Sequence, residues 1–132
     1  MGKTLKILFV VIFVADFLGL YYRLFQDFFW LDIALHFLGG IWLAIFFALV
    51  FKDKNAIFMV SFVALVGVLW EFSEYVFLND LMMKIFGSAD SGLYAMSLDD
   101  TLADLAMDLV GAVAVAAGYW ISRKKSLPAL NK

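Results

Sequence analysis

The chain has 132 residues, of which 65% are hydrophobic and 18% aromatic, and its mean hydropathy is +0.95. These values lie above those of soluble globular domains and indicate an integral membrane protein with a single domain, residues 1–132. The chain has no cysteine, which excludes disulfides, thiolate metal sites and thiol catalysis. The small net charge of −2 and the lack of a basic stripe argue against a nucleic-acid partner.

Four stretches are apolar over the roughly 20 residues that a helix needs to cross a bilayer. They predict an all-α bundle of four transmembrane helices at approximately 7–25, 31–51, 56–78 and 101–122. The first stretch follows Lys3 and Lys6, as a signal peptide would. Its apolar run is long, however, and no small-residue cleavage motif is found at its end, so we expect it to be retained as a span.

The basic residues predict the orientation of the helices, because cytoplasmic loops are enriched in Lys and Arg. With both termini in the cytoplasm, only Arg23 and Lys84 fall on the outer side. The cytoplasmic side then holds Lys3, Lys6, Lys52, Lys54, Arg123, Lys124, Lys125 and Lys132. Aromatic residues near helix ends fit this arrangement, whereas Trp42 and Trp70 do not. We expect a multi-pass protein of the cell inner or plasma membrane.

The segment between the third and fourth spans is too short and too polar at its ends to cross the bilayer. We expect a short interfacial helix there, with its membrane side formed by Met82, Met83, Ile85 and Phe86. Ser97 lies three residues before Asp100, as in a capping box, and Asp99 and Asp100 suit the positive end of a helix dipole.

Small residues on the fourth predicted helix favour close packing against a neighbour in lipid. They are Gly111, Ala112, Ala114 and Gly118. Together with Gly39 and Gly40 on the second helix, this face would also permit a homodimer.

Ionisable side chains recur near the outer ends of three predicted helices. They are Asp32 and His36 on the second, Glu71 and Glu74 on the third, and Asp104 and Asp108 on the fourth. Because the helices alternate in direction, all of these residues lie at a similar depth, in the outer third of the membrane. An ionised carboxylate near the centre of a span costs about 2.5–3.5 kcal/mol, so the group requires compensation.

Two forms of compensation are open: several acids are protonated, or water and a cation reach them from the outer face. Charge balance favours a divalent metal, namely Mg²⁺, Mn²⁺ or Ca²⁺ if carboxylates dominate, and Zn²⁺ or Fe²⁺ if His36 is a ligand. The predicted ligands are His36, Glu71, Asp104, Asp108, Asp32 and Glu74. His36 could instead be a hydrogen-bonded core residue, and Asp32 a helix cap.

Asp16 is a further acid in the middle of the first predicted span. We expect it to pair with Arg23, which lies two turns later on nearly the same helix face. It could also complete the acidic cluster from below or relay protons.

Three motifs occur in a fixed order along the chain. They are "LDIALHFLGG" with Asp32 and His36, "WEFSEY" with Glu71 and Glu74, and "DDTLADLAMDLVGA" with Asp104 and Asp108. This order resembles the YjdF-like family of small membrane proteins and, more distantly, the VanZ-like family. In VanZ-like proteins a Gln stands at the position of Glu74 and an Asn at that of Asp108, so the site is more acidic here. The VanZ resemblance implies a connection to the cell envelope.

Three functions fit these observations. The first is a metal-dependent hydrolase or transferase in which Glu71 and Glu74 are catalytic, with Glu74 as general base, and which acts on a lipid or lipid-linked envelope substrate. The second is an ion- or proton-coupled carrier. The third is a structural or regulatory module that uses an ion for stability. We favour the enzyme, because the region below His36 is almost entirely apolar and offers no polar path to the cytoplasm.

Overall fold

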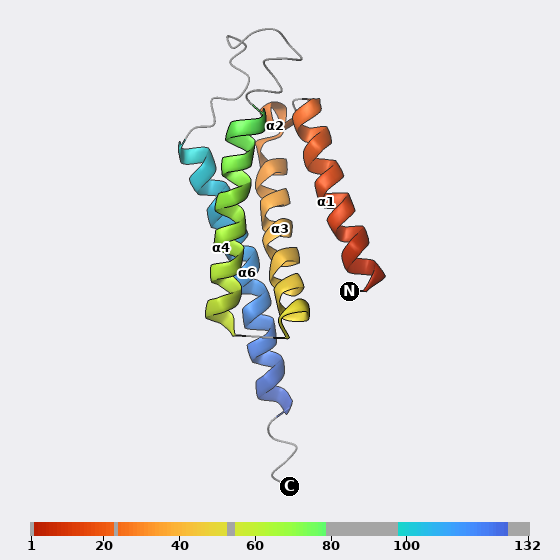
Figure 1. Ribbon diagram of the computed structural model, residues 1–132, viewed down its shortest axis with the longest axis vertical. Coiled ribbons are helices and arrows are strands. Elements are labelled where there is room, and N and C mark those ends of the chain that lie inside the picture. The colour runs from red at the N-terminus through yellow and green to blue at the C-terminus, as the bar shows by residue number, and fades with distance from the viewer. Residues whose placement is uncertain (1, 23, 53–54, 79–97, 127–132) are drawn as a thin grey trace.

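The computed structural model describes residues 2–22, 24–52, 55–78 and 98–126, and the regular structure in these ranges is helical. The elements are α1 (Lys3–Tyr21), α2 (Leu24–Asp27), α3 (Phe29–Val50), α4 (Ala56–Ser73), the π-helical turn η1 (Glu74–Leu78) and α6 (Leu98–Ser126). The four long helices lie side by side along the long axis of the molecule (Figure 1). The predicted all-α class is therefore confirmed.

Within the part of the chain that the structure describes, three helices are long and apolar enough to cross a membrane: Phe29–Val50, Ala56–Val76 and Leu98–Lys124. They correspond to the second, third and fourth predicted spans. The last of these helices begins before the predicted residue 101, because the polar residues Asp99 and Asp100 already belong to its first turn. The predicted interfacial helix and the Ser97 cap lie outside the described residues.

The first predicted span differs from the structure at its C-terminal end. A continuous helix to residue 25 was wrong, because α1 ends at Tyr21 and the chain turns before α2. Phe25 packs back onto Gly19, where even a Cβ atom would collide with the phenyl ring. The glycine thus leaves the space that the reversal of the chain needs.

α3 is the central helix and packs against α1, α4 and α6. At the end of the bundle away from α2, small and bulky side chains of three helices form the apolar core: Ala44, Phe47, Ala48, Met59, Val63 and Ala112. Asn55 caps the start of α4 by accepting a hydrogen bond from the Ile57 amide at 2.9 Å. The polar candidate residues lie at the opposite end of the bundle from this core.

Two glycines bring the backbones of α3 and α6 into direct contact. A Cβ atom at Gly40 would collide with the Asp108 carbonyl, and one at Gly111 with the Phe37 carbonyl. The predicted small-residue packing is thus present within the chain, at Gly111 and the buried Ala112. Ala114 and Gly118 remain exposed, and a Cβ at Gly118 would have no neighbour within 4 Å.

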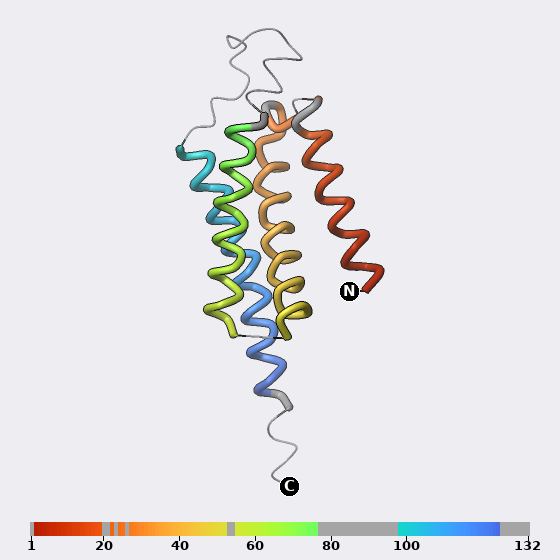
Figure 2. Tube along the Cα trace, in the orientation of Figure 1, coloured from red at the N-terminus to blue at the C-terminus, as the bar shows by residue number. Residues whose placement is uncertain are grey.

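α1 leans away from the other helices toward its N-terminal end, as the backbone traces show (Figures 1 and 2). A hydrogen bond ties this end to α3: Trp42 Nε1 donates to the Leu5 carbonyl at 2.7 Å. The Trp42 ring also packs against Phe9, with 4.9 Å between ring centroids. Trp42 lies outside the aromatic belt because it joins two helices.

Candidate functional site

The candidate residues gather at one end of the bundle because α3 and α6 begin there and α4 ends there (Figure 1). Five acidic or histidine side chains at this end are buried or nearly so. They are Asp32 and His36 on α3, Glu71 on α4, and Asp104 and Asp108 on α6. The predicted convergence of three helices at one depth is therefore present in the structure.

The His36 imidazole is the centre of this group, and both of its nitrogens face carboxylates. Nδ1 lies 3.5 Å from Oδ2 of Asp108. Nε2 lies 3.8 Å from Oδ1 of Asp32 and 3.8 Å from Oε1 of Glu71. The two edges of the ring thus meet different acids: Asp108 on one, and Asp32 with Glu71 on the other.

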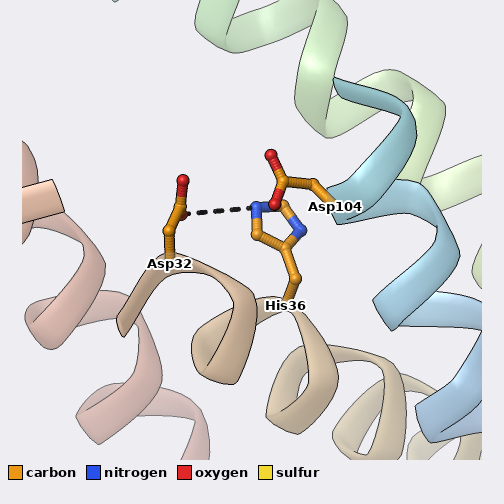
Figure 3. A group of neighbouring side chains, drawn as sticks. All are labelled: Asp32, His36 and Asp104. Carbon is orange, nitrogen blue, oxygen red and sulfur yellow. Dashed lines mark ion pairs between the residues drawn. The ribbon is translucent and has the colours of Figure 1, made fainter. Parts of the chain in front are cut away.

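Asp104 reaches the group from α6. It forms a group with Asp32 and His36. One possible ligand atom from each of these three side chains lies within 4.8 Å of the other two. Figure 3 shows the two carboxylates extending toward the imidazole from different helices, with the Asp32 contact drawn as a dashed line. Two helices therefore supply this part of the site, and α4 adds Glu71.

Glu71 is the least satisfied side chain of the group. It is 5% exposed, and both of its carboxylate oxygens are buried without a hydrogen-bond partner among the described residues. Thr101 lies beside it but does not complete a hydrogen bond of ordinary geometry. A buried carboxylate without partners costs several kcal/mol, so an uncompensated Glu71 would be strongly unfavourable.

The ion pairs of these carboxylates among the described residues all involve His36. Even a protonated imidazole carries a single positive charge, whereas Asp32, Glu71 and Asp108 surround it. In a medium of low dielectric constant, carboxylates that are gathered around one imidazole repel one another strongly when they are ionised. The cluster therefore needs protons or a further cation.

Glu74 lies apart from the imidazole, in the π-helical turn η1 that follows α4. Its Oε1 accepts a hydrogen bond from Trp70 Nε1 at 3.0 Å. The contact explains why Trp70 also lies outside the predicted aromatic belt. π-helical turns often mark functional sites, because the extra residue shifts the side chains that follow.

Asp16 of α1 is buried at 7% exposure and faces the same region. It lines a cavity of about 160 Å³ together with His36 and Asp108, among residues of α1, α3, α4 and α6. The predicted partner Arg23 lies outside the described residues.

Two features of the site were not predicted from the sequence. Gly67 leaves room for Asp108, since a Cβ there would lie 2.8 Å from its Oδ2. The bond between Trp70 and Glu74 also escaped prediction, although their i, i+4 spacing is a sequence signal for contact on a helix.

The spacing of the candidate ligands can be compared with the size of a metal site. Protein ligands lie about 2.0–2.2 Å from Zn²⁺ or Mg²⁺, so two ligand atoms on one ion are at most about 4.4 Å apart. The separations of 3.8 Å from His36 Nε2 to Asp32 and to Glu71 satisfy this limit. The group whose ligand atoms all lie within 4.8 Å of one another consists of Asp32, His36 and Asp104, without Glu71.

Comparison with known proteins identifies the family. Residues 1–125 match the model of a family described as "Predicted membrane protein (DUF2238)". The chain belongs to this family. No curated protein and no solved structure matches the chain. Family membership and the three apolar helices together establish a membrane protein that contains a buried acidic and histidine cluster.

Proposed function

We propose that this protein binds a divalent metal ion at the end of its helical bundle and uses it to act on a membrane lipid or a lipid-linked substrate. His36 Nε2, Asp32, Glu71 and Asp104 are the proposed ligands. The observation that carries the proposal is Glu71, whose buried oxygens have no hydrogen-bond partner and whose Oε1 faces His36 Nε2 at 3.8 Å. An ion between these atoms supplies the missing partner.

Asp108 takes a different role from the predicted one of ligand. Metal-bound histidines commonly donate their other ring N–H to a carboxylate, which fixes the tautomer and the ring orientation. The contact of Asp108 with Nδ1 at 3.5 Å fits this arrangement and directs the Nε2 lone pair toward Asp32 and Glu71. Asp108 is thus a positioning residue.

The donor set limits the identity of the ion. Carboxylates suit Mg²⁺, Ca²⁺ and Mn²⁺, whereas an imidazole suits Zn²⁺ and Fe²⁺. One imidazole with three carboxylates fits Mn²⁺ or Zn²⁺ better than Ca²⁺, which takes oxygen ligands throughout. Three helices contribute ligands, so the ion also joins α3, α4 and α6.

The chemistry proposed for the ion is activation of water or polarisation of a phosphate or carbonyl oxygen, in a hydrolase or transferase. Glu74 is the proposed general base, since its carboxylate lies on the next turn after Glu71 and is held by Trp70. We propose α1 as a fourth span, both termini in the cytoplasm and the site near the outer leaflet of the inner or plasma membrane. The VanZ-like resemblance supports a role in the cell envelope.

The alternative function is an ion- or proton-coupled carrier. The lining of the cavity argues against this alternative. A carrier needs a polar path from the site toward the cytoplasm. The cavity is lined mainly by Phe, Ile, Leu, Val and Trp side chains, and its acids are Asp16 and Asp108. This lining favours a site for an apolar molecule over a path for ions.

The Glu71→Gln variant tests the metal site. Wild-type protein purified in detergent should contain a stoichiometric divalent metal that a chelator removes, and the variant should contain less. A bound ion stabilises the folded state, so the variant should also unfold at a lower temperature than the metal-loaded wild type. In chelator the order should reverse, because Gln removes an unpaired buried charge.

Asp99→Asn is the matched control, since Asp99 is an exposed acid on α6. It should keep the metal content of the wild type. An unchanged metal content in Glu71→Gln, or wild-type protein without metal, would contradict the proposed site. If the wild type binds the ion but Glu74→Gln turns over lipid as fast as the wild type, Glu74 is not the general base. The ion would then serve the stability of the protein instead of catalysis.

A further inference from the structure

The cavity beside the cluster separates α1 from two of the other long helices. Among the described elements, α1 contacts α2 and α3, and it makes no backbone contact with α4 or α6. Residues of all four long helices nevertheless line the cavity, and α1 contributes Phe9, Ile12, Phe13 and Asp16. α1 therefore forms one wall of a space that the remaining bundle does not fill.

The lining divides the cavity into a polar end and an apolar end. The polar end is formed by Asp16, His36 and Asp108, and of the proposed metal ligands His36 is the one that lines the cavity. From His36 to Leu43, α3 descends about 10 Å at ~1.5 Å per residue, and the lining over this distance is apolar apart from the Trp42 indole N–H. That N–H is already donated to the Leu5 carbonyl. Below the acids, therefore, the cavity offers no free polar group to a ligand among its lining residues.

The volume indicates what such a space can hold. An apolar cavity of about 150 Å³ stays free of water and takes up small apolar molecules. The present cavity, at about 160 Å³, is of this size. Phe9 and Phe13, at 46% and 50% exposure, form its boundary toward the surroundings of the bundle. In a bilayer those surroundings are acyl chains.

The direction of the cavity matches that of a lipid in a bilayer. Its polar end lies near the end of the bundle that carries α2, and its apolar end extends toward the middle of the helices. A phospholipid in the adjacent leaflet has its head group at the membrane face and its chains toward the midplane. The head group of such a lipid would therefore lie at the polar end of the cavity, and its acyl chain at the apolar end.

We propose that this cavity holds part of one acyl chain of a membrane phospholipid, whose phosphate group reaches the metal ion at His36. This inference rests on the proposed function, since the acids alone would repel a phosphate. It identifies the substrate class as a phospholipid, bound with its head group at the cluster and its chain against Trp42, Val66 and Leu43.

Fluorescence quenching tests the inference. The background variant Trp30→Phe/Trp120→Phe removes two exposed tryptophans and leaves Trp42 and Trp70, which both line the cavity. The protein is placed in phosphatidylcholine bilayers loaded with Mn²⁺ or Zn²⁺, and phosphatidylglycerol with brominated acyl chains is added in increasing proportion. We expect quenching that saturates at a low proportion of the brominated lipid, because a bound chain lies beside Trp42.

Two substitutions on α4 provide a matched pair. Val66 lines the cavity, whereas Val68 is 53% exposed on the same helix. Val66→Phe should fill the space and abolish the saturable quenching, and Val68→Phe should leave it intact. Both variants should keep the metal content of the wild type, because neither residue belongs to the cluster.

Each outcome decides between the two proposals. Quenching that is unsaturable, or equal in Val66→Phe and Val68→Phe, overturns the chain-binding inference even if metal is bound. Saturable quenching in protein that binds no metal overturns the proposed phosphate contact and the metal site, and leaves a purely apolar pocket. Saturable quenching that needs the ion and is lost in Val66→Phe supports both.

Discussion

His36 Nδ1 faces Asp108 Oδ2 at 3.5 Å, so the contact occupies one nitrogen of the imidazole and leaves the other for a ligand. Nε2 then points to the side where Asp32 and Glu71 lie. Asp108, which faces the ring, lies on α6, and His36 lies on α3. The closest helix pair of the bundle thus sets the orientation of the candidate ligand.

Removal of the Asp108 carboxylate should weaken metal binding without abolishing it. In Asp108→Ala the imidazole loses the acceptor that fixes its orientation, and such losses lower metal affinity by roughly 10- to 100-fold. Titration of the purified protein with Mn²⁺, followed by electron paramagnetic resonance, measures the change. Asp99→Ala on the exposed start of α6 should bind like the wild type. Equal affinities in the two variants would show that Asp108 does not position His36.

Gly40→Ala should destabilise the bundle at the crossing of α3 and α6. The added methyl group collides with the Asp108 main-chain carbonyl, and overpacking of this kind costs about 1–3 kcal/mol. Thermal unfolding in detergent should show a lower midpoint. Gly118→Ala is the control, because its methyl group has no neighbour within 4 Å. A midpoint for Gly40→Ala as high as that of the control would contradict the close crossing.

Trp42→Phe should loosen the N-terminal half of α1. The variant keeps an aromatic ring but loses the hydrogen bond to the Leu5 carbonyl, which is worth about 1 kcal/mol. Hydrogen exchange should then be faster at the amides of α1 than in the wild type. Trp120→Phe, which changes an exposed ring beneath Lys124, should leave exchange in α1 unchanged. Equal rates of hydrogen exchange at the α1 amides of both variants would show that Trp42 does not hold α1 against α3.

The predicted orientation can be tested with introduced thiols, because the natural chain has none. Trp30 and Trp120 are both exposed and lie near opposite ends of the bundle. In intact cells, a membrane-impermeant maleimide should label Trp30→Cys and should label Trp120→Cys only after the membrane is opened. The reverse pattern would place both the site and the lipid contact at the inner leaflet.

The sequence was sufficient to predict the helical class, three spans and the gathering of the acids at one end of the bundle. Long apolar runs determine spans almost by themselves, because lipid requires every backbone polar group to be satisfied within a helix. The gathering of the acids follows from alternating helix directions and the position of each residue along its helix. Both are properties of the chain that need no tertiary contact.

Other features required the structure. The side of the imidazole that each acid meets depends on helix rotation, so Asp32 and Asp108 could not be distinguished as ligand and positioning residue. The turn after Tyr21 depends on Phe25 packing onto Gly19, a contact that apolar periodicity does not encode. The distribution of the small residues was likewise ambiguous, and Gly40 and Gly111 proved to face each other's helices.

The direct contact of α3 and α6 at Gly40 and Gly111 also has a mechanical consequence. Helices separated by long side chains can slide as those side chains change rotamer, but main chains in contact can only move as one body. His36 and Asp108 lie beside this contact, so bending of the surrounding bilayer would carry them together without altering their separation. α1, whose contacts among the described helices are with α2 and α3, does not belong to this rigid pair.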